Sequence, residues 1–246
     1  MLELNTFTII ARCPETANLG IAVATAVPAV GSVCPYTRAG VGAVSTQSWV
    51  NPYLAIGILA HLEAGLDAEA ALGEAIAADD GRDVRQVGTV DAMGRAAAWS
   101  GAQCTPWYGQ HIGDGVVILG NMLAGPEILA AMVTSFEASA GSALDERLML
   151  ALEAGDANGG DKRGKQSAAL RVHAREDYPL MDIRADEHPR PVQELRRILT
   201  IARQQLIPFI SGMPKRGAPA GKAPTEVEQL LALSPPARPG GGGSYP

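Results

Sequence analysis

Groups of strand-like segments alternate with pairs of helix-like segments along this chain, and that order restricts the folds open to it. The first group holds two apolar runs, residues 6–11 and 19–25, rich in strand-forming side chains and separated by turn residues from Cys13 to Asn18. This pattern predicts a hairpin. Further strands are expected at residues 39–48, 86–90, 95–100, 116–123, 167–172 and 181–185.

Apolar residues at helical spacing predict five helices, four of which come in pairs. Their expected ranges are 53–64, 68–78, 127–138, 144–154 and 191–209. Paired helices between groups of strands argue against a parallel sheet built from βαβ units and favour antiparallel sheets covered by helices. We therefore expect an α+β protein: a four-layer αββα sandwich in which two antiparallel sheets lie between helical layers.

The length of 246 residues and an apolar content of 47% indicate a folded chain with a sizeable core. We assign residues 1–210 to a single domain. Residues 211–246 are rich in Pro, Gly, Ala and Lys and end in a glycine run, a composition that predicts a flexible tail.

Charge and composition limit the classes of molecule that the protein is expected to bind. The net charge of −6 is spread along the chain without a long basic run, so we expect no nucleic-acid partner. No apolar run reaches about eighteen residues and no signal-peptide pattern opens the chain, so we expect no membrane association and a cytoplasmic location. The cysteines and histidines are too widely spaced for a disulfide framework or a metal site, and we predict no cofactor.

One expected helix carries an apolar stripe wide enough to contact more than one neighbour. Leu195, Ile198, Leu199, Ala202 and Leu206 recur at helical spacing within residues 191–209. The stripe either packs on the core of the same chain or contacts a partner helix. We expect a homo-oligomer, whose order the sequence does not fix.

Thr6 heads the first expected strand, and its position suggests a specific chemistry. A threonine with a free α-amine carries a nucleophile and a base in one residue, because such an amine titrates near pH 8 whereas an amide nitrogen accepts no proton there. Here Thr6 follows Asn5, so its nitrogen lies in a peptide bond. Either the chain starts elsewhere in the cell, or the Asn5–Thr6 bond is cut, or Thr6 is not a nucleophile.

Two further stretches could carry chemistry. The loop at residues 159–167 gathers Asp161, Arg163, Gln166 and Ser167 beside three glycines, so backbone N–H groups and a guanidinium could hold a carboxylate or an oxyanion. Alternatively it is a surface turn in which Asp161 and Arg163 pair. Cys104 lies in a polar loop, and as a nucleophile it would need a nearby base; the alternative is a small buried side chain.

Several segments, in order along the chain, resemble the domain of unknown function 1028 family. They are TFTIIAR at 6–12, GIAVAT at 20–25, RAGVGAVSTQ at 38–47, GNMLAG at 120–125, GGDKRGKQSAAL at 159–170 and DIRADEHP at 182–189. The resemblance implies an N-terminal nucleophile (Ntn) hydrolase fold, which is an αββα sandwich, and hydrolysis or transfer at an amide bond. Family members typically begin Met-Thr-Phe, whereas four additional residues precede Thr6 here.

The resemblance also implies which residues line an active site. Thr6 would be the nucleophile, and Gln47 or Asn121 would donate to the oxyanion. Substrate-binding candidates are Thr46, Asn51, Asp161, Arg163, Gln166 and Ser167, with Arg163 holding a substrate carboxylate. For the Thr46-Gln47 and Gly120-Asn121 pairs, a strand-end hydrogen-bonding role is the alternative.

We predict an Ntn-type amidohydrolase that cleaves a small amide. The more specific form of this prediction is a substrate that also carries a carboxylate. Two alternatives stay open. In the first, the chain is a non-catalytic ligand-binding or assembly protein on the same fold, with Thr6 internal. In the second, it is a thiol enzyme that uses Cys104.

Overall fold

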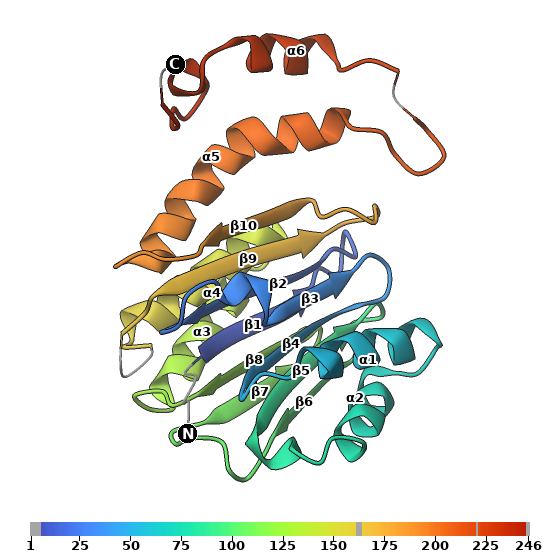
Figure 1. Ribbon diagram of the computed structural model, residues 1–246, viewed down its shortest axis with the longest axis vertical. Helices are drawn as coiled ribbons and strands as arrows, with labels where there is room; N and C mark the ends of the chain where they lie inside the picture. The colour runs from blue at the N-terminus through green and yellow to red at the C-terminus, as the bar shows by residue number, and fades with distance from the viewer. Residues whose placement is uncertain (1–5, 161–163, 220, 245–246) are drawn as a thin grey trace.

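The computed structural model describes residues 6–160, 164–219 and 221–244, which form two antiparallel sheets and six α-helices (Figure 1). The larger sheet has six strands in the order β10 (Met181–Ala185), β9 (Ser167–His173), β2 (Leu19–Thr25), β1 (Thr6–Arg12), β8 (Val116–Asn121) and β7 (Gly109–Gly113). The smaller sheet has four, in the order β3 (Pro35–Arg38), β4 (Gly42–Ser48), β5 (Arg85–Asp91) and β6 (Ala96–Ser100). The α+β class and the antiparallel pairing are as the sequence predicts.

The helices cover the sheets in pairs. Helices α1 (Pro52–Glu63) and α2 (Ala68–Ala77) contact the smaller sheet, and α3 (Glu127–Ala138) and α4 (Leu144–Ala157) contact the larger one (Figure 1). Asn51 caps α1 by accepting a hydrogen bond from the Tyr53 N–H at 3.1 Å, and Pro52 occupies the first turn. Asp67 caps α2 through the Ala70 N–H at 2.9 Å.

The two faces of β1 contact different parts of the core, because successive side chains of a strand point to opposite sides. Phe7 and Ile9 pack in the cluster that includes α3 and α4. Ile10 lies in a cluster with Val90 of β5 and Leu119 of β8, so this face is turned toward the smaller sheet. Thr6 lies on the same face as Ile10, in the layer between the sheets.

Gly88 on β5 marks a close approach between the sheets. A Cβ atom there would lie 2.5 Å from Leu119 Cδ2, 2.8 Å from Val117 Cγ1 and 3.0 Å from Ile10 Cδ1. Only the absence of a side chain permits this spacing. The layer between the sheets is therefore tightly packed around Gly88.

Helix α5 (Pro191–Gly212) uses its apolar stripe within the chain. Leu195 and Leu199 are fully buried in the core cluster of the larger sheet. Arg196 binds Glu153 at 2.7 Å and Arg203 binds Asp145 at 2.7 Å, and these two ion pairs fasten α5 to α4 and its first turn. Leu195, Leu199 and Ala202 of the stripe are thus covered by the chain's own core, whereas Ile198 and Leu206 are only partly buried. The homo-oligomer remains a prediction.

The C-terminal segment contains more structure than the composition suggests. Helix α6 (Thr225–Ala232) lies beyond α5 at the top of Figure 1, and Val227 is its buried side chain. The Gln205 side chain on α5 donates to the Pro239 and Gly241 carbonyls, both at 2.9 Å. The expected domain boundary at residue 210 also falls inside α5. The flexibility of residues 211–246 remains a prediction.

Two short strands do not appear among the sequence predictions. β7 contains glycines at both ends and β3 begins with Pro35, so neither shows the β-branched alternation of a central strand. Both lie at a sheet edge. Across the described residues, no helix combines the length and apolar character that membrane crossing requires.

Candidate functional site

Thr6 is buried in the layer between the sheets, at the end where β1 begins. Its side chain is 1% exposed, and its hydroxyl donates to the Thr25 hydroxyl at 3.3 Å. Thr6 pairs with Thr25 on one side and with Asn121 on the other, which places all three side chains on one face of the sheet. Thr6 therefore starts a central strand with polar residues on both flanks.

The direction of the Thr6 backbone N–H follows from the strand pattern. The Arg12 N–H donates to the Gly115 carbonyl at 2.9 Å, on the β8 side of β1. Backbone groups of alternate residues in a strand point the same way. The N–H of Thr6 therefore points toward β8, where its register partner is Asn121.

Gln86 on β5 is the centre of a buried amide network. Its Nε2 donates to the Gly109 carbonyl at 3.1 Å and to the Gly120 carbonyl at 3.0 Å, so the orientation of the amide is fixed by two backbone acceptors. Its Oε1 then accepts from Gln47 Nε2 at 2.8 Å and from Asn121 Nδ2 at 3.1 Å. Gln47 and Asn121, which are both predicted site residues, are thus joined through Gln86, which the sequence analysis did not select.

Gln47 is fully engaged in this network. One amide hydrogen goes to Gln86, and Nε2 also lies 3.4 Å from the Thr6 carbonyl oxygen. Its Oε1 accepts from the Thr8 hydroxyl at 2.5 Å. Because both N–H groups have partners, Gln47 has no donor left for a substrate oxyanion, and its geometry suits a structural role beside Thr6.

Asn121 differs from Gln47, because half of its amide is unused. Its side chain is fully buried, and Nδ2 donates to Gln86. Its Oδ1 has no hydrogen-bond partner among the described residues. Nδ2 has a second hydrogen without a partner among the described residues, so Asn121 keeps an open acceptor and one open donor, and an oxyanion requires the donor.

Thr46 and Asn51 do not join the Thr6 network. Thr46 follows the alternation of β4, on which Val44 packs against α1 and α2 and Gln47 faces the other sheet. Its hydroxyl accepts from the Asn51 N–H at 3.3 Å, and the Asn51 side chain caps α1. Both residues organise the turn between β4 and α1.

The predicted glycine loop is placed only in part. Ser167 pairs with Thr25, donates to the Val27 carbonyl at 2.6 Å and accepts from the Val30 N–H at 3.0 Å, so it holds the segment after β2. The Gln166 N–H donates to the Thr25 carbonyl at 2.7 Å. Asp161 and Arg163 lie outside the described residues.

Two residues with left-handed backbone angles follow the amides. Ser48 has φ 64° directly after Gln47, and Met122 has φ 53° directly after Asn121. Residues other than glycine rarely adopt such backbone angles, which are enriched at functional sites. Both strands therefore turn sharply away at the level of Thr6.

Cys104 has the wrong surroundings for a nucleophile. It is buried, its thiol donates to the Arg85 carbonyl at 3.2 Å, and burial raises the pKa of the thiol above its ordinary value. A reactive cysteine needs the opposite, a thiolate favoured at neutral pH. The geometry therefore gives the thiol-enzyme alternative no support.

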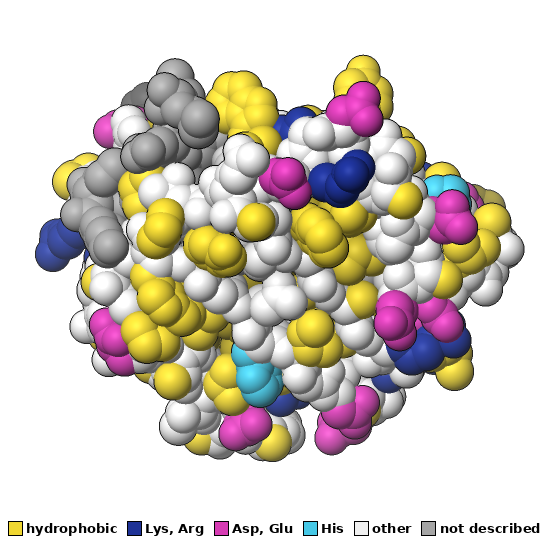
Figure 2. All heavy atoms as spheres, turned by 90° about the horizontal axis from the view of Figure 1, so that it is seen from below, with side chains coloured by type: hydrophobic (Ala, Val, Ile, Leu, Met, Phe, Trp, Pro, Cys, Tyr) yellow, Lys and Arg dark blue, Asp and Glu magenta, His cyan; other side chains and the backbone are white. Residues whose placement is uncertain are grey.

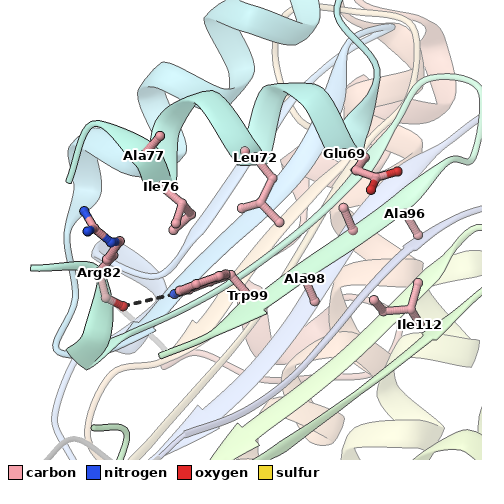
Figure 3. A pocket seen from close by; sticks show the side chains of 11 residues that line it. Glu69, Leu72, Ile76, Ala77, Arg82, Ala96, Ala98, Trp99 and Ile112 are labelled. Carbon is pink, nitrogen blue, oxygen red and sulfur yellow. Dashed lines mark hydrogen bonds between the residues drawn. The ribbon is translucent and has the colours of Figure 1, made fainter. Parts of the chain in front are cut away.

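A groove lies along the edge of the smaller sheet, between α2 and β7. The groove has a volume of about 700 Å³. Leu72 and Ile76 point into it from α2, Trp99 and Ala98 form its floor on β6, and Ile112 closes the other side (Figure 3). The Trp99 indole donates to the Arg82 carbonyl at 3.0 Å, which fixes the ring. The groove is mainly apolar, in contrast to the amide network.

The face seen from below Figure 1 carries mixed charges. Figure 2 shows Lys and Arg side chains lying singly or beside Asp and Glu on that face, without a continuous basic area. Among the described residues, no three His, Cys, Asp or Glu side chains gather where a metal ion could bind.

A family model for a family of unknown function, DUF1028, matches residues 6–195, which is most of the chain and begins at Thr6. The chain belongs to the DUF1028 family. Among solved structures, it is similar to the DUF1028 protein SPO2555 from Silicibacter pomeroyi, with a TM-score of 0.81 and 27% identity over 89% of this chain and 95% of that one.

A second solved structure, Anbu (ancestral beta-subunit) from Yersinia bercovieri, matches with a TM-score of 0.41 and 11% identity, over 85% of this chain and 99% of that one. At that distance it carries no weight in assigning the fold or the function of this DUF1028 protein. No curated protein matches the chain.

Proposed function

We propose that this DUF1028 protein is an N-terminal threonine amidohydrolase on a four-layer αββα fold. The contacts of α1 and α2 with one sheet, of α3 and α4 with the other, and of the sheets with each other at Gly88 support that layering. The single observation that carries the function is the placement of Thr6. It heads a central strand, its hydroxyl bonds to the Thr25 hydroxyl, and the buried Gln47 amide contacts its backbone carbonyl.

The reaction begins once the Asn5–Thr6 bond is cut, because only then does Thr6 have a basic nitrogen. The freed α-amine takes the proton from the Thr6 hydroxyl while Oγ1 bonds to the carbonyl carbon of the substrate amide. Collapse of the tetrahedral intermediate breaks the C–N bond, and the ammonium form of Thr6 protonates the departing amine. Water then attacks the resulting ester, which releases the acid and regenerates Thr6.

The substrate is proposed to be a small amide that carries a carboxylate, held by the loop at residues 159–167. Lys165 pairs with Asp156 at 2.7 Å, so this lysine is already neutralised. The assignment of carboxylate binding to Arg163 thus rests on the sequence. Gln47 presents no free donor, and the oxyanion is expected to be held by backbone N–H groups, with the second Nδ2 hydrogen of Asn121 available beside them.

Acylation of Thr6 by a β-lactone tests the proposal without a known substrate. A cleavable N-terminal fusion partner would be removed so that the chain begins at Thr6. Intact mass after incubation with a simple alkyl β-lactone should show one added lactone, mapped to Thr6 by peptide mass spectrometry. Thr6→Ala should lose the adduct and Thr6→Ser should keep it.

The intact chain provides the second control, since its amide nitrogen gives no base. Equal labelling of the intact chain and the chain that begins at Thr6 would contradict the proposed mechanism. An adduct that persists in Thr6→Ala would place the reaction elsewhere. Intact mass of protein purified without an N-terminal tag would show whether cells cut the Asn5–Thr6 bond.

The groove at β6 favours a second candidate, a ligand-binding protein without catalysis. Its apolar walls suit a compact apolar ligand. The fluorescence of 1-anilinonaphthalene-8-sulfonate should rise on binding there, and Leu72→Glu should abolish the rise whereas Thr6→Ala should not. Fluorescence that is unchanged in Leu72→Glu would contradict this candidate.

A further inference from the structure

The side-chain oxygen of Asn121 is an unusual group in this protein. The residue is 0% exposed, yet Oδ1 has no hydrogen-bond partner among the described residues. Buried polar atoms in folded proteins nearly always have partners, and an exception calls for an explanation. An acceptor left open beside Thr6 indicates a donor that the described residues of the intact chain do not supply.

The amide orientation of Asn121 follows from its neighbours. Gln86 must turn Nε2 toward the Gly109 and Gly120 carbonyls, since those groups only accept. Its Oε1 therefore faces Asn121, which must present Nδ2. Reversing the Asn121 amide would set two oxygens against each other. Oδ1 is thus the open atom.

The backbone of Thr6 is turned toward the same residue. The strand pattern directs the Thr6 nitrogen to β8, where Asn121 is its register partner. A peptide nitrogen has a single hydrogen, which the ladder of an antiparallel pair uses. A free α-amine carries additional N–H groups, and these are the donors that Asn121 Oδ1 lacks.

We propose that Asn121 Oδ1 accepts a hydrogen bond from the α-amine of Thr6 after the Asn5–Thr6 bond is cut. Asn121 is then a positioning residue: its carbonyl oxygens orient the amine so that the nitrogen lone pair is directed at the Thr6 hydroxyl. Gln86 acts one step further away, by holding Asn121 in that orientation. This inference rests on the proposed function, because it requires the amine to be freed.

The pKa of the Thr6 amine tests the contact without any substrate. It is measured by NMR titration of the Thr6 Cα shift in a ¹³C-labelled chain that begins at Thr6. Asn121→Asp has the same shape and places a carboxylate against the amine, so it should raise that pKa by about one unit or more, a tenfold gain in proton affinity. Asn121→Leu should lower it, because the acceptor is lost.

Asn18→Asp is the matched control. It makes the same chemical change in the turn between β1 and β2, about 20 Å from Thr6 along a seven-residue strand. The amine pKa should stay at its wild-type value there. An equal rise in Asn18→Asp and Asn121→Asp, or no rise in Asn121→Asp, would overturn the inference.

The wild-type chain that begins at Thr6 gives a measurement that needs no variant to fold. Its crystal structure should place the Thr6 nitrogen within hydrogen-bond distance of Asn121 Oδ1, and a separation above about 3.5 Å would contradict the contact. β-Lactone labelling separates the two proposals. A Thr6 amine that responds to Asn121 but is never acylated would leave this inference standing and remove the proposed hydrolase. Acylation of Thr6 together with an amine pKa that does not respond to Asn121 substitutions would support the hydrolase and remove this inference.

Discussion

The layer between the two sheets has two different regions, although the same strands build both. Around Gly88, the side chains of Ile10, Val90, Val117 and Leu119 form an apolar cluster. Two residues further along β5 and β8, the same face carries Gln86 and Asn121. Both regions are buried, but the first is held by packing and the second by directional hydrogen bonds. The difference teaches that burial here does not imply an apolar environment.

The largest effect should come from placing an amide in the apolar region. Leu119→Asn loses buried hydrocarbon and adds an amide without partners, so the free energy of unfolding should fall by about 4 kcal/mol. Leu119→Met, which nearly conserves volume, should cost less than about 1.5 kcal/mol. Denaturant unfolding measures both. Equal values would show that this region tolerates polarity as the other does.

The converse change in the amide region should cost somewhat less. Gln86→Leu leaves the Gly109 and Gly120 carbonyls and the Gln47 and Asn121 amides without their shared partner. The free energy of unfolding should fall by about 3 kcal/mol. Gln103→Leu, at an exposed position of the loop after β6, is the control and should stay within about 1 kcal/mol. A stabilised Gln86→Leu protein would mean that the network is not satisfied in solution.

The smallest effect should follow from removing one hydroxyl of the network. Thr8→Val keeps the shape and deprives Gln47 Oε1 of its donor, so unfolding free energy should drop by about 1–2 kcal/mol. Thr89→Val is the matched control, because the buried Thr89 hydroxyl has no partner among the described residues. That change should be neutral or stabilising. The comparison would fail if the two variants lost the same stability.

Much of the architecture is readable from strand and helix periodicity. The hairpins β1–β2 and β5–β6 and the helix pairs α1–α2 and α3–α4 lie where the sequence predicts them, because each combines a clear period with turn or cap residues. β3 and β7 lack such a pattern because edge strands need only one covered side. Helix α6 is preceded by a Pro-rich segment whose composition indicates flexibility instead.

Of the residues that the sequence analysis selects, Thr6, Gln47 and Asn121 lie close together in the structure, whereas Thr46 and Asn51 lie apart from them. The catalytic and binding roles of these residues stay predictions. Which atoms donate depends on Gln86, a residue far from Thr6, Gln47 and Asn121 in sequence whose amide is oriented by two backbone carbonyls. Thr46 could not be separated from Gln47 because every residue of β4 is buried, so alternation in polarity gives no direction.

Gly88 limits the distance between the two sheets that the amide network has to span. A glutamine side chain has a fixed reach, and Gln86 spans from the smaller sheet to the Gly120 carbonyl on the larger one only at the spacing that Gly88 allows. Any side chain at residue 88 would displace Leu119, Val117 or Ile10, and where these side chains cannot repack, the sheets must separate. In that case the amides lose contact although none of them has changed. The geometry around Thr6 is thus set in part by a residue that has no side chain.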